Sequence, residues 1–313
     1  MSLPMRIAGI AVGAAVAASC GGSREPETKS LPDTGSVAVE GAQLPFRVVG
    51  TGRPCLVFGS HIYYPRTFSE NFDRALRCAH VDQRGFLNSP PDGTAPAYSV
   101  DVAIADIERA RIALGLDRPI LVGHSMHGTV VLAYALAHPD KVAGVVSIGA
   151  PPGFDTTLTM AGAAYWGSFA SEGRKAFDER SPLRLSQDSL GKLTPGAAFI
   201  ATYIGNSARY WADSSFDASG LWAGVTANPG VIFQLFDMRK PYQLPEAPAD
   251  GRPPVFLALG RFDFVVPPTL WDGRGRAFPQ LTKQIFERSG HTPQLEEAAA
   301  FDQALLEWVA RLR

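Results

Sequence analysis

Gly123-His124-Ser125-Met126-His127-Gly128 follows the apolar run 119–122 and precedes a helix-like run, 129–138. A strand, a tight turn and a helix in this order can hold a serine with its hydroxyl group exposed. A serine hydroxyl is a poor nucleophile at neutral pH and needs a neighbouring base to take its proton. The stretch therefore predicts a nucleophile elbow at Ser125, on an α/β fold.

Two further motifs supply partners for this serine, and both follow apolar, strand-like runs. Asp263 lies in a Gly-Arg-Phe-Asp context, and His291 lies in Ser-Gly-His-Thr-Pro. His291 would take the serine proton, and Asp263 would orient the imidazole and stabilise its cation. Asp155, which follows an earlier strand, is an alternative acid. The chain order of serine, acid and histidine predicts a catalytic triad of Ser125, Asp263 and His291.

These ordered motifs make the chain resemble the α/β-hydrolase superfamily over roughly residues 37–313. Two stretches look most like the proline iminopeptidase (peptidase S33) group: Val81-Asp82-Gln83-Arg84-Gly85 and Ala208-Arg209-Tyr210-Trp211. The resemblance implies a mostly parallel central sheet flanked by helices, with a helical cap inserted between strands 6 and 7. We interpret the first stretch as an architectural buttress of the oxyanion loop, with direct substrate contact as the alternative.

The alternation of strands and helices indicates the same organisation. Apolar strand-like runs alternate with helix-like runs through residues 37–151 and again through 254–313, which together form the expected α/β-hydrolase core. The alternation stops over 152–253, an aromatic-rich stretch that we assign to the cap above the active site. Most of its rings are expected to hold the cap together, and a minority to face the substrate.

Residues 1–20 have the features of an export signal. Arg6 precedes an apolar stretch, 7–18, that is short for a membrane span and typical of a signal-peptide core. The small residues before Cys20 resemble the lipobox of bacterial lipoproteins, in which the cysteine carries lipid. Residues 21–36 have the composition of a flexible tether. We expect an exported lipoprotein that contacts a membrane only through Cys20; plain secretion and an uncleaved anchor are the alternatives.

Cys55 and Cys78 are the cysteines that remain if Cys20 carries lipid. Each begins a strand-like run, and the resemblance implies that the two strands are neighbours. An oxidising compartment would permit a disulfide. The preferred interpretation is two buried free thiols, because neighbouring strands do not always orient their side chains for bridging.

An oxyanion hole needs backbone N–H groups that point at the developing negative charge. Met126, directly after the serine, is one expected donor. The family usually has a His-Gly pair after the third strand; here Phe58-Gly59 stands in that place, which makes Ser60 the expected second donor. His61 is a candidate pocket residue at the same loop.

His127 is a second candidate pocket residue. It stands two positions after the serine, where the family usually has a small residue so that helix and strand can pack closely. Either the elbow is slightly opened, with Gly128 relieving the crowding, or His127 lines the site and contacts substrate.

Composition and charge narrow the range of partners. The net charge is −1, with 29 basic and 30 acidic residues and no basic run, so nucleic acid is not an expected partner. No histidine pair has metal-ligand spacing with a carboxylate, so neither a metal nor another cofactor is expected. The expected partner is a small-molecule ester or peptide substrate.

Together these features predict an exported serine hydrolase that cleaves an ester or an amide through an acyl-enzyme. A proline iminopeptidase-like aminopeptidase is the alternative, although that group usually has Gly-Gly-Ser-Trp-Gly at the elbow. A weakly catalytic, ligand-binding or regulatory protein of the same fold is the second alternative, because His127 and Phe58 depart from the family pattern. An aspartate nucleophile is excluded by Ser125.

Overall fold

A computed structural model of the chain describes Met1 and residues 33–88, 97–237 and 239–312. The predicted signal peptide, its Cys20 and most of the predicted tether lie outside the described residues. Within those residues, no helix is long and apolar enough to cross a lipid bilayer.

The core is an eight-stranded sheet in the order β1-β2-β4-β3-β5-β6-β9-β10. The hairpin β1–β2 is antiparallel and joins β4 antiparallel, whereas the remaining neighbours are parallel. The fold class predicted from the sequence is thereby confirmed. The strands are β1 (Thr34–Val39), β2 (Ala42–Val49), β3 (Arg53–Gly59), β4 (Leu76–Asp82), β5 (Ile120–His124), β6 (Gly144–Ile148), β9 (Val255–Gly260) and β10 (Leu281–Phe286).

Helices cover both faces of this sheet. Strands β5, β6 and β9 are buried along their whole length, as expected for central parallel strands with near-continuous apolar sequences. One buried apolar cluster lies under α2 and α3, and the other under α1 and α12. The core helices are α1 (Glu70–Ala75), α2 (Val100–Ala113), α3 (Met126–Ala137), α11 (Pro293–Glu296) and α12 (Ala298–Val309), with 3₁₀ turns at Tyr64–Arg66, Arg84–Phe86, Pro139–Lys141 and Pro268–Trp271.

Two boundaries show how local chemistry sets the helices. Ser99 caps α2, and its hydroxyl accepts the N–H of Val102 at 3.3 Å, as its position before the periodic run indicates. Helix α1 ends at Ala75, because the next residue, Leu76, already belongs to β4.

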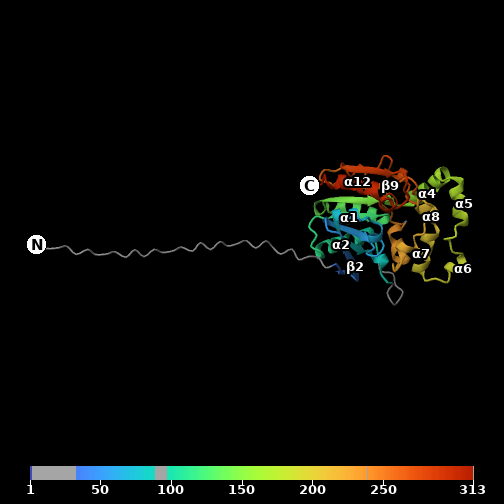
Figure 1. The fold of residues 1–313 in the computed structure, drawn as a ribbon, viewed down its shortest axis with the longest axis horizontal. Coiled ribbons are helices and arrows are strands. Elements are labelled where there is room, and N and C mark those ends of the chain that lie inside the picture. Colours follow the sequence, from blue (N-terminus) through green and yellow to red (C-terminus); the bar gives the residue numbers. More distant parts are fainter. Residues whose placement is uncertain (2–32, 89–96, 238, 313) are drawn as a thin grey trace. The chain divides into compact units, whose positions relative to one another are not determined.

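The cap lies between β6 and β9, and Figure 1 shows its helices gathered beside one end of the sheet. Two short strands, β7 (Gly153–Phe154) and β8 (Tyr242–Gln243), pair antiparallel where the chain leaves and re-enters the core. This pairing had no sequence signal, because each strand has two residues. The cap helices are α4 (Thr156–Phe169), α5 (Glu172–Arg180), α6 (Gln187–Leu190), α7 (Pro195–Gly205), α8 (Ser207–Tyr210), α9 (Ser219–Trp222) and α10 (Pro229–Ile232), followed by a 3₁₀ turn at Phe233–Phe236.

Cys55 and Cys78 form a disulfide, so the expectation of two free thiols was wrong. The two residues are direct partners in the parallel register of β3 and β4, with 4.2 Å between their Cα atoms. Directly paired residues present their side chains to the same face of a sheet, and both cysteines are fully buried there. The register of the two strands, which the sequence alone does not specify, brings the sulfur atoms together.

The Asp82-Gln83-Arg84-Gly85 turn supports the loop that follows β3. The N–H of Gln83 donates to the carbonyl of Gly59 at 2.8 Å. Arg84 forms a buried two-bond ion pair with Asp106 of α2, at 2.8 and 2.9 Å. These contacts agree with the architectural interpretation of the turn.

Candidate active site

Ser125 lies at the sharp turn between β5 and α3. Its backbone has φ 56° and ψ −131°, and it is the one non-glycine residue of the described chain with positive φ. Such a conformation is costly for an L-residue and persists where the surroundings fix it, often at functional sites. Here the N–H of Ser125 donates to the carbonyl of Ile148 at 2.8 Å, and its own carbonyl accepts the N–H of Gly128 at 2.9 Å.

Two glycines allow strand and helix to approach each other at this turn. A Cβ atom on Gly123 would lie 2.4 Å from the carbonyl oxygen of His127, and one on Gly128 would lie 2.5 Å from the Cβ of Ala150. Both distances are far below ordinary carbon contacts. Gly128 therefore provides the close packing that the family usually obtains one position earlier, and the side chain of His127 is free to line the pocket.

His291 and Asp263 form a buried hydrogen-bonded pair. The Nδ1 atom of His291 lies 2.6 Å from Oδ2 of Asp263, and both side chains are excluded from solvent. The other carboxylate oxygen accepts the N–H groups of Val265 (2.9 Å) and Val266 (2.7 Å), which fixes its orientation. Because Nδ1 is engaged, Nε2 is the imidazole nitrogen left for a proton transfer.

Asp155, the alternative acid, lies at the start of the cap. Its carboxylate caps α4 by accepting the N–H of Thr157 at 2.8 Å, and it also contacts the side chain of Gln243. Of the two candidate acids, the structure pairs Asp263 with His291.

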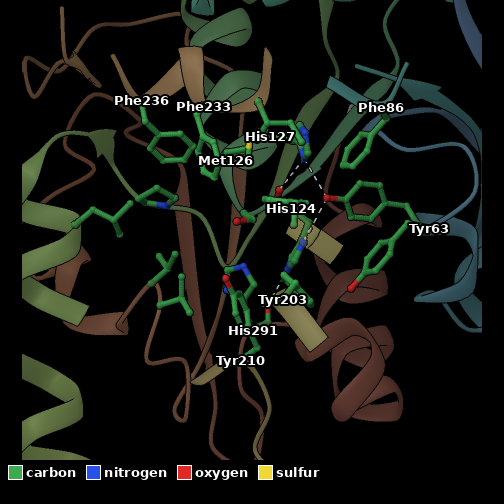
Figure 2. A pocket seen from close by; sticks show the side chains of 18 of the residues that line it. Tyr63, Phe86, His124, Met126, His127, Tyr203, Tyr210, Phe233, Phe236 and His291 are labelled. Atoms are coloured by element: carbon green, nitrogen blue, oxygen red, sulfur yellow. Dashed lines mark hydrogen bonds between the residues drawn. The ribbon is translucent and has the colours of Figure 1, made fainter. Parts of the chain in front are cut away.

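Two further histidines and a tyrosine connect the elbow to its surroundings. The Nε2–H of His124 donates to the carbonyl of His291 at 2.8 Å, which leaves Nδ1 of the neutral ring as an acceptor. The hydroxyl of Tyr64 lies 3.5 Å from that atom and 3.0 Å from Nδ1 of His127. Figure 2 shows these hydrogen bonds around His124 and His127 as dashed lines.

Burial keeps both of these imidazoles neutral. It lowers the pKa of His127 to about 4 and the pKa of His124 well below its ordinary value. The network therefore adds no charge near Ser125 at pH 7. Neither His124 nor Tyr64 had been given a part in the site from the sequence; the adjacent Tyr63-Tyr64 pair in the loop after β3 was the available signal.

The expected oxyanion donors differ in their placement. Met126 lines the same cavity as Ser125, and its N–H at the first position of α3 has no intrahelical partner. Ser60 lies along a separate cavity, and its hydroxyl accepts the N–H of Tyr63 at 3.1 Å. The side chain of Ser60 is thus turned into its own loop.

His61 does not line the pocket that contains Ser125, contrary to the expectation. It borders the separate cavity with Ser60, where its Nδ1 atom lies 2.8 Å from the carboxylate of Asp82. Its N–H also donates to that carboxylate at 2.6 Å. The buried acid at the end of β4 therefore holds His61 away from the cavity with Ser125.

Ser125, Met126, His127 and His291 line one cavity of about 190 Å³ between the core and the cap. Its walls are mainly aromatic and aliphatic. In Figure 2, Phe233 and Phe236 lie on one side and Tyr63 and Phe86 on the opposite side. Further rings come from the cap: Phe199, Tyr203, Tyr210 and Trp222.

The described wall of the cavity is built without carboxylate, ammonium or guanidinium groups. Among the described residues that line it, none is Asp, Glu, Lys or Arg. Burial raises the pKa of Tyr210 to about 12 and also raises the pKa of Tyr63 and Tyr203, so these hydroxyls stay protonated. Within the described part of the chain, no group of His, Cys, Asp and Glu side chains is arranged to hold a metal ion.

Comparisons with known proteins agree with this geometry. Residues 52–298 match the family described as alpha/beta hydrolase fold. The AB hydrolase superfamily protein YclE of Bacillus subtilis is 35% identical over 272 residues, which cover 86% of this chain and 96% of that protein.

Solved structures show the same fold at low identity. A proline iminopeptidase from Mycobacterium smegmatis superimposes with a TM-score of 0.64 at 17% identity, covering 89% of this chain and 98% of that one. A thermophilic esterase from Thermogutta terrifontis gives a TM-score of 0.57 at 19% identity, covering 90% and 99%. The match to the family and the similarity to YclE lead to one conclusion: the chain belongs to the alpha/beta hydrolase fold family and is a hydrolase.

Proposed function

We propose that this hydrolase cleaves uncharged carboxylic esters with apolar substituents, using Ser125 as nucleophile. Ser125 Oγ attacks the ester carbonyl while Nε2 of His291 takes its proton, and the backbone N–H groups of Met126 and Ser60 stabilise the oxyanion. The alcohol leaves with the proton from His291. Water, deprotonated by the same imidazole, then releases the acid and restores the serine.

The uncharged, aromatic cavity is the observation that carries this proposal. An aminopeptidase substrate brings a cationic amino terminus, and a buried cation is costly unless a carboxylate pairs with it. The cavity offers no carboxylate among its described lining residues. An uncharged ester requires only apolar contact and the oxyanion donors.

Three acidic residues of the cap have partners outside the pocket. Asp178 forms ion pairs with Arg184 (2.6 Å) and Arg209 (3.1 Å). Asp213 accepts hydrogen bonds from Ser215, and Glu172 contacts Lys175 at 2.9 Å. These contacts argue against an iminopeptidase-type amine site.

Export and lipid anchoring at Cys20 are part of the proposal. The Cys55–Cys78 disulfide supports an oxidising compartment, since such bonds persist mainly outside the reducing cytoplasm. The experiment is a globomycin-sensitive shift in electrophoretic mobility of the expressed chain, with Cys20→Ala as control.

The first test of the chemistry is parallel turnover of nitrophenyl esters of increasing chain length and of a prolyl arylamide. We expect ester cleavage that falls roughly 10⁴-fold or more in Ser125→Ala, because the nucleophile is then absent. Ser168→Ala, at an exposed serine of the cap, should retain wild-type turnover. Serine-dependent cleavage of the arylamide would contradict the ester proposal. Tight ligand binding without labelling of Ser125 by a fluorophosphonate would indicate a receptor instead.

A further inference from the structure

The loops that carry Asp263 and His291 are both bonded to one short stretch of the cap, residues 208–212. The N–H of Phe264 donates to the carbonyl of Arg209 at 3.1 Å, and the N–H of His291 donates to the next carbonyl, that of Tyr210, at 2.5 Å. Figure 2 shows Tyr210 beside His291 at the pocket. Consecutive carbonyls of the cap thus bind the acid loop and the histidine loop.

Gly290 brings the two backbones into direct contact. A Cβ atom at this position would lie 2.3 Å from the carbonyl oxygen of Tyr210 and 2.8 Å from the Cα atom of Trp211. Any side chain would push the cap stretch away from His291. The Ser-Gly-His motif therefore serves this contact as well as the turn.

Glu296 joins the same elements from the side of α11. One carboxylate oxygen accepts the N–H of Ala212 (2.7 Å) and that of Gly290 (3.0 Å), and the other accepts the N–H of Thr292 (3.0 Å). A single anion thus holds the cap stretch and the residues on both sides of His291. Three hydrogen bonds from backbone N–H groups are a strong constraint on where that loop can lie.

Arg174 of α5 holds the other side of the stretch. Its guanidinium donates to the carbonyls of Ala208 and Trp211, each at 2.8 Å, and to that of Ala212. It also lies 5.6 Å from the ring centre of Phe262 and 5.4 Å from that of Phe264, on the acid loop. The stretch is therefore bound between a cation and an anion.

We propose that residues 208–212, Glu296 and Arg174 form a brace that positions the imidazole of His291 for proton transfer. The inference rests on the proposed serine mechanism and assigns Glu296 as a positioning residue. The backbone of the Ala208-Arg209-Tyr210-Trp211 motif then supports the catalytic loops, while the ring of Tyr210 lines the pocket. A rigid lifting of the whole cap would therefore displace His291.

The test is Glu296→Gln, which keeps the shape of the side chain but replaces one acceptor oxygen by a donor NH₂ group. We expect kcat for the best ester to fall about tenfold with KM within about twofold, since misplacement of a proton-transfer group affects the chemical step. The rate of fluorophosphonate labelling should fall by the same factor. Glu307→Gln, at an exposed position of α12, is the matched control and should leave kcat unchanged.

Arg174→Met provides a second, independent perturbation that keeps the apolar stem over the phenylalanine rings. If both residues act through the same stretch, the double variant should lose less activity than the product of the two single losses. Multiplicative losses, or wild-type kcat in folded Glu296→Gln, would overturn the brace. Either result would leave the serine mechanism intact as long as Ser125→Ala is inactive, so the two proposals fail separately.

Discussion

The floor and the roof of the pocket are built in different ways. The floor, β5 with the first turn of α3, is set by backbone geometry: Ser125 has positive φ, and Gly123 and Gly128 allow contact between strand and helix. The roof, residues 152–253, consists of short helices held by aromatic rings and by polar contacts to the core. Backbone geometry leaves a local sequence signature, whereas contacts between distant side chains do not.

This difference has a consequence for substitutions. A change in the floor disturbs the sheet and the position of Ser125 together, because the same residues serve both. A change on the outer side of the roof meets open space at several positions. Three predictions test this contrast, in order of decreasing expected effect.

The first prediction concerns the disulfide that joins β3 and β4. Replacing Cys55 and Cys78 by alanine should lower the free energy of unfolding by about 3 kcal/mol, because the bond closes a loop of sequence separation 23 in the unfolded chain. Urea unfolding of the oxidised protein and of the double variant measures the difference. Added reductant should destabilise the wild type only. Equal urea midpoints for wild type and variant would show that the stability of the protein does not depend on the disulfide.

The second compares the same substitution in floor and roof. Gly128→Ala should cost about 2 kcal/mol of stability and reduce ester turnover, because the new methyl group meets Ala150 and Ser147 at 2.5 and 2.8 Å. Gly167→Ala, on an exposed face of α4 with no atom within 4 Å, should instead stabilise by about 0.5–1 kcal/mol. Thermal unfolding and ester kinetics of both variants give the comparison. Similar effects at the two glycines would break the contrast.

The third prediction concerns how the stability of the core depends on pH. All six histidines lie outside the cap. Burial lowers the pKa of His80 to about 3, so the unfolded chain binds more protons than the folded one below an unfolded pKa of about 6.5. The stabilising effect of its neutral form is complete above that pH and is lost as the pH falls. When the pH falls from 7.5 to 5.5, the free energy of unfolding of wild type should therefore decrease by about 1 kcal/mol more than that of His80→Leu. Urea unfolding at the two pH values tests this, and an unchanged pH dependence would contradict it.

The sequence predicted the parts of the molecule that depend on local pattern. The elbow, the acid loop and the histidine loop each occupy a short, recognisable stretch. Their order along the chain, with strand-like runs before them, indicated the fold. The structure pairs Asp263 with His291 as the order of motifs indicates. The catalytic roles themselves remain predictions until Ser125→Ala is measured.

What the sequence did not predict depends on contacts between distant segments. The disulfide follows from the register of β3 and β4, and the position of His61 follows from the buried carboxylate of Asp82. Glu296 is followed by Glu297, and such a pair resembles an ordinary solvated helix start. Only the folded chain shows that it binds Ala212, 84 positions earlier.

The absence of charge in the described lining of the cavity also bears on how substrate arrives. A protein of net charge −1 whose described pocket wall has no Asp, Glu, Lys or Arg exerts little long-range electrostatic attraction on a neutral ester. Encounter is then governed by diffusion and by partitioning from water onto aromatic surface. Added salt would screen almost nothing along that path. The second-order rate constant for substrate binding should thus stay constant as ionic strength rises, over a range in which enzymes with charged active-site entrances become slower.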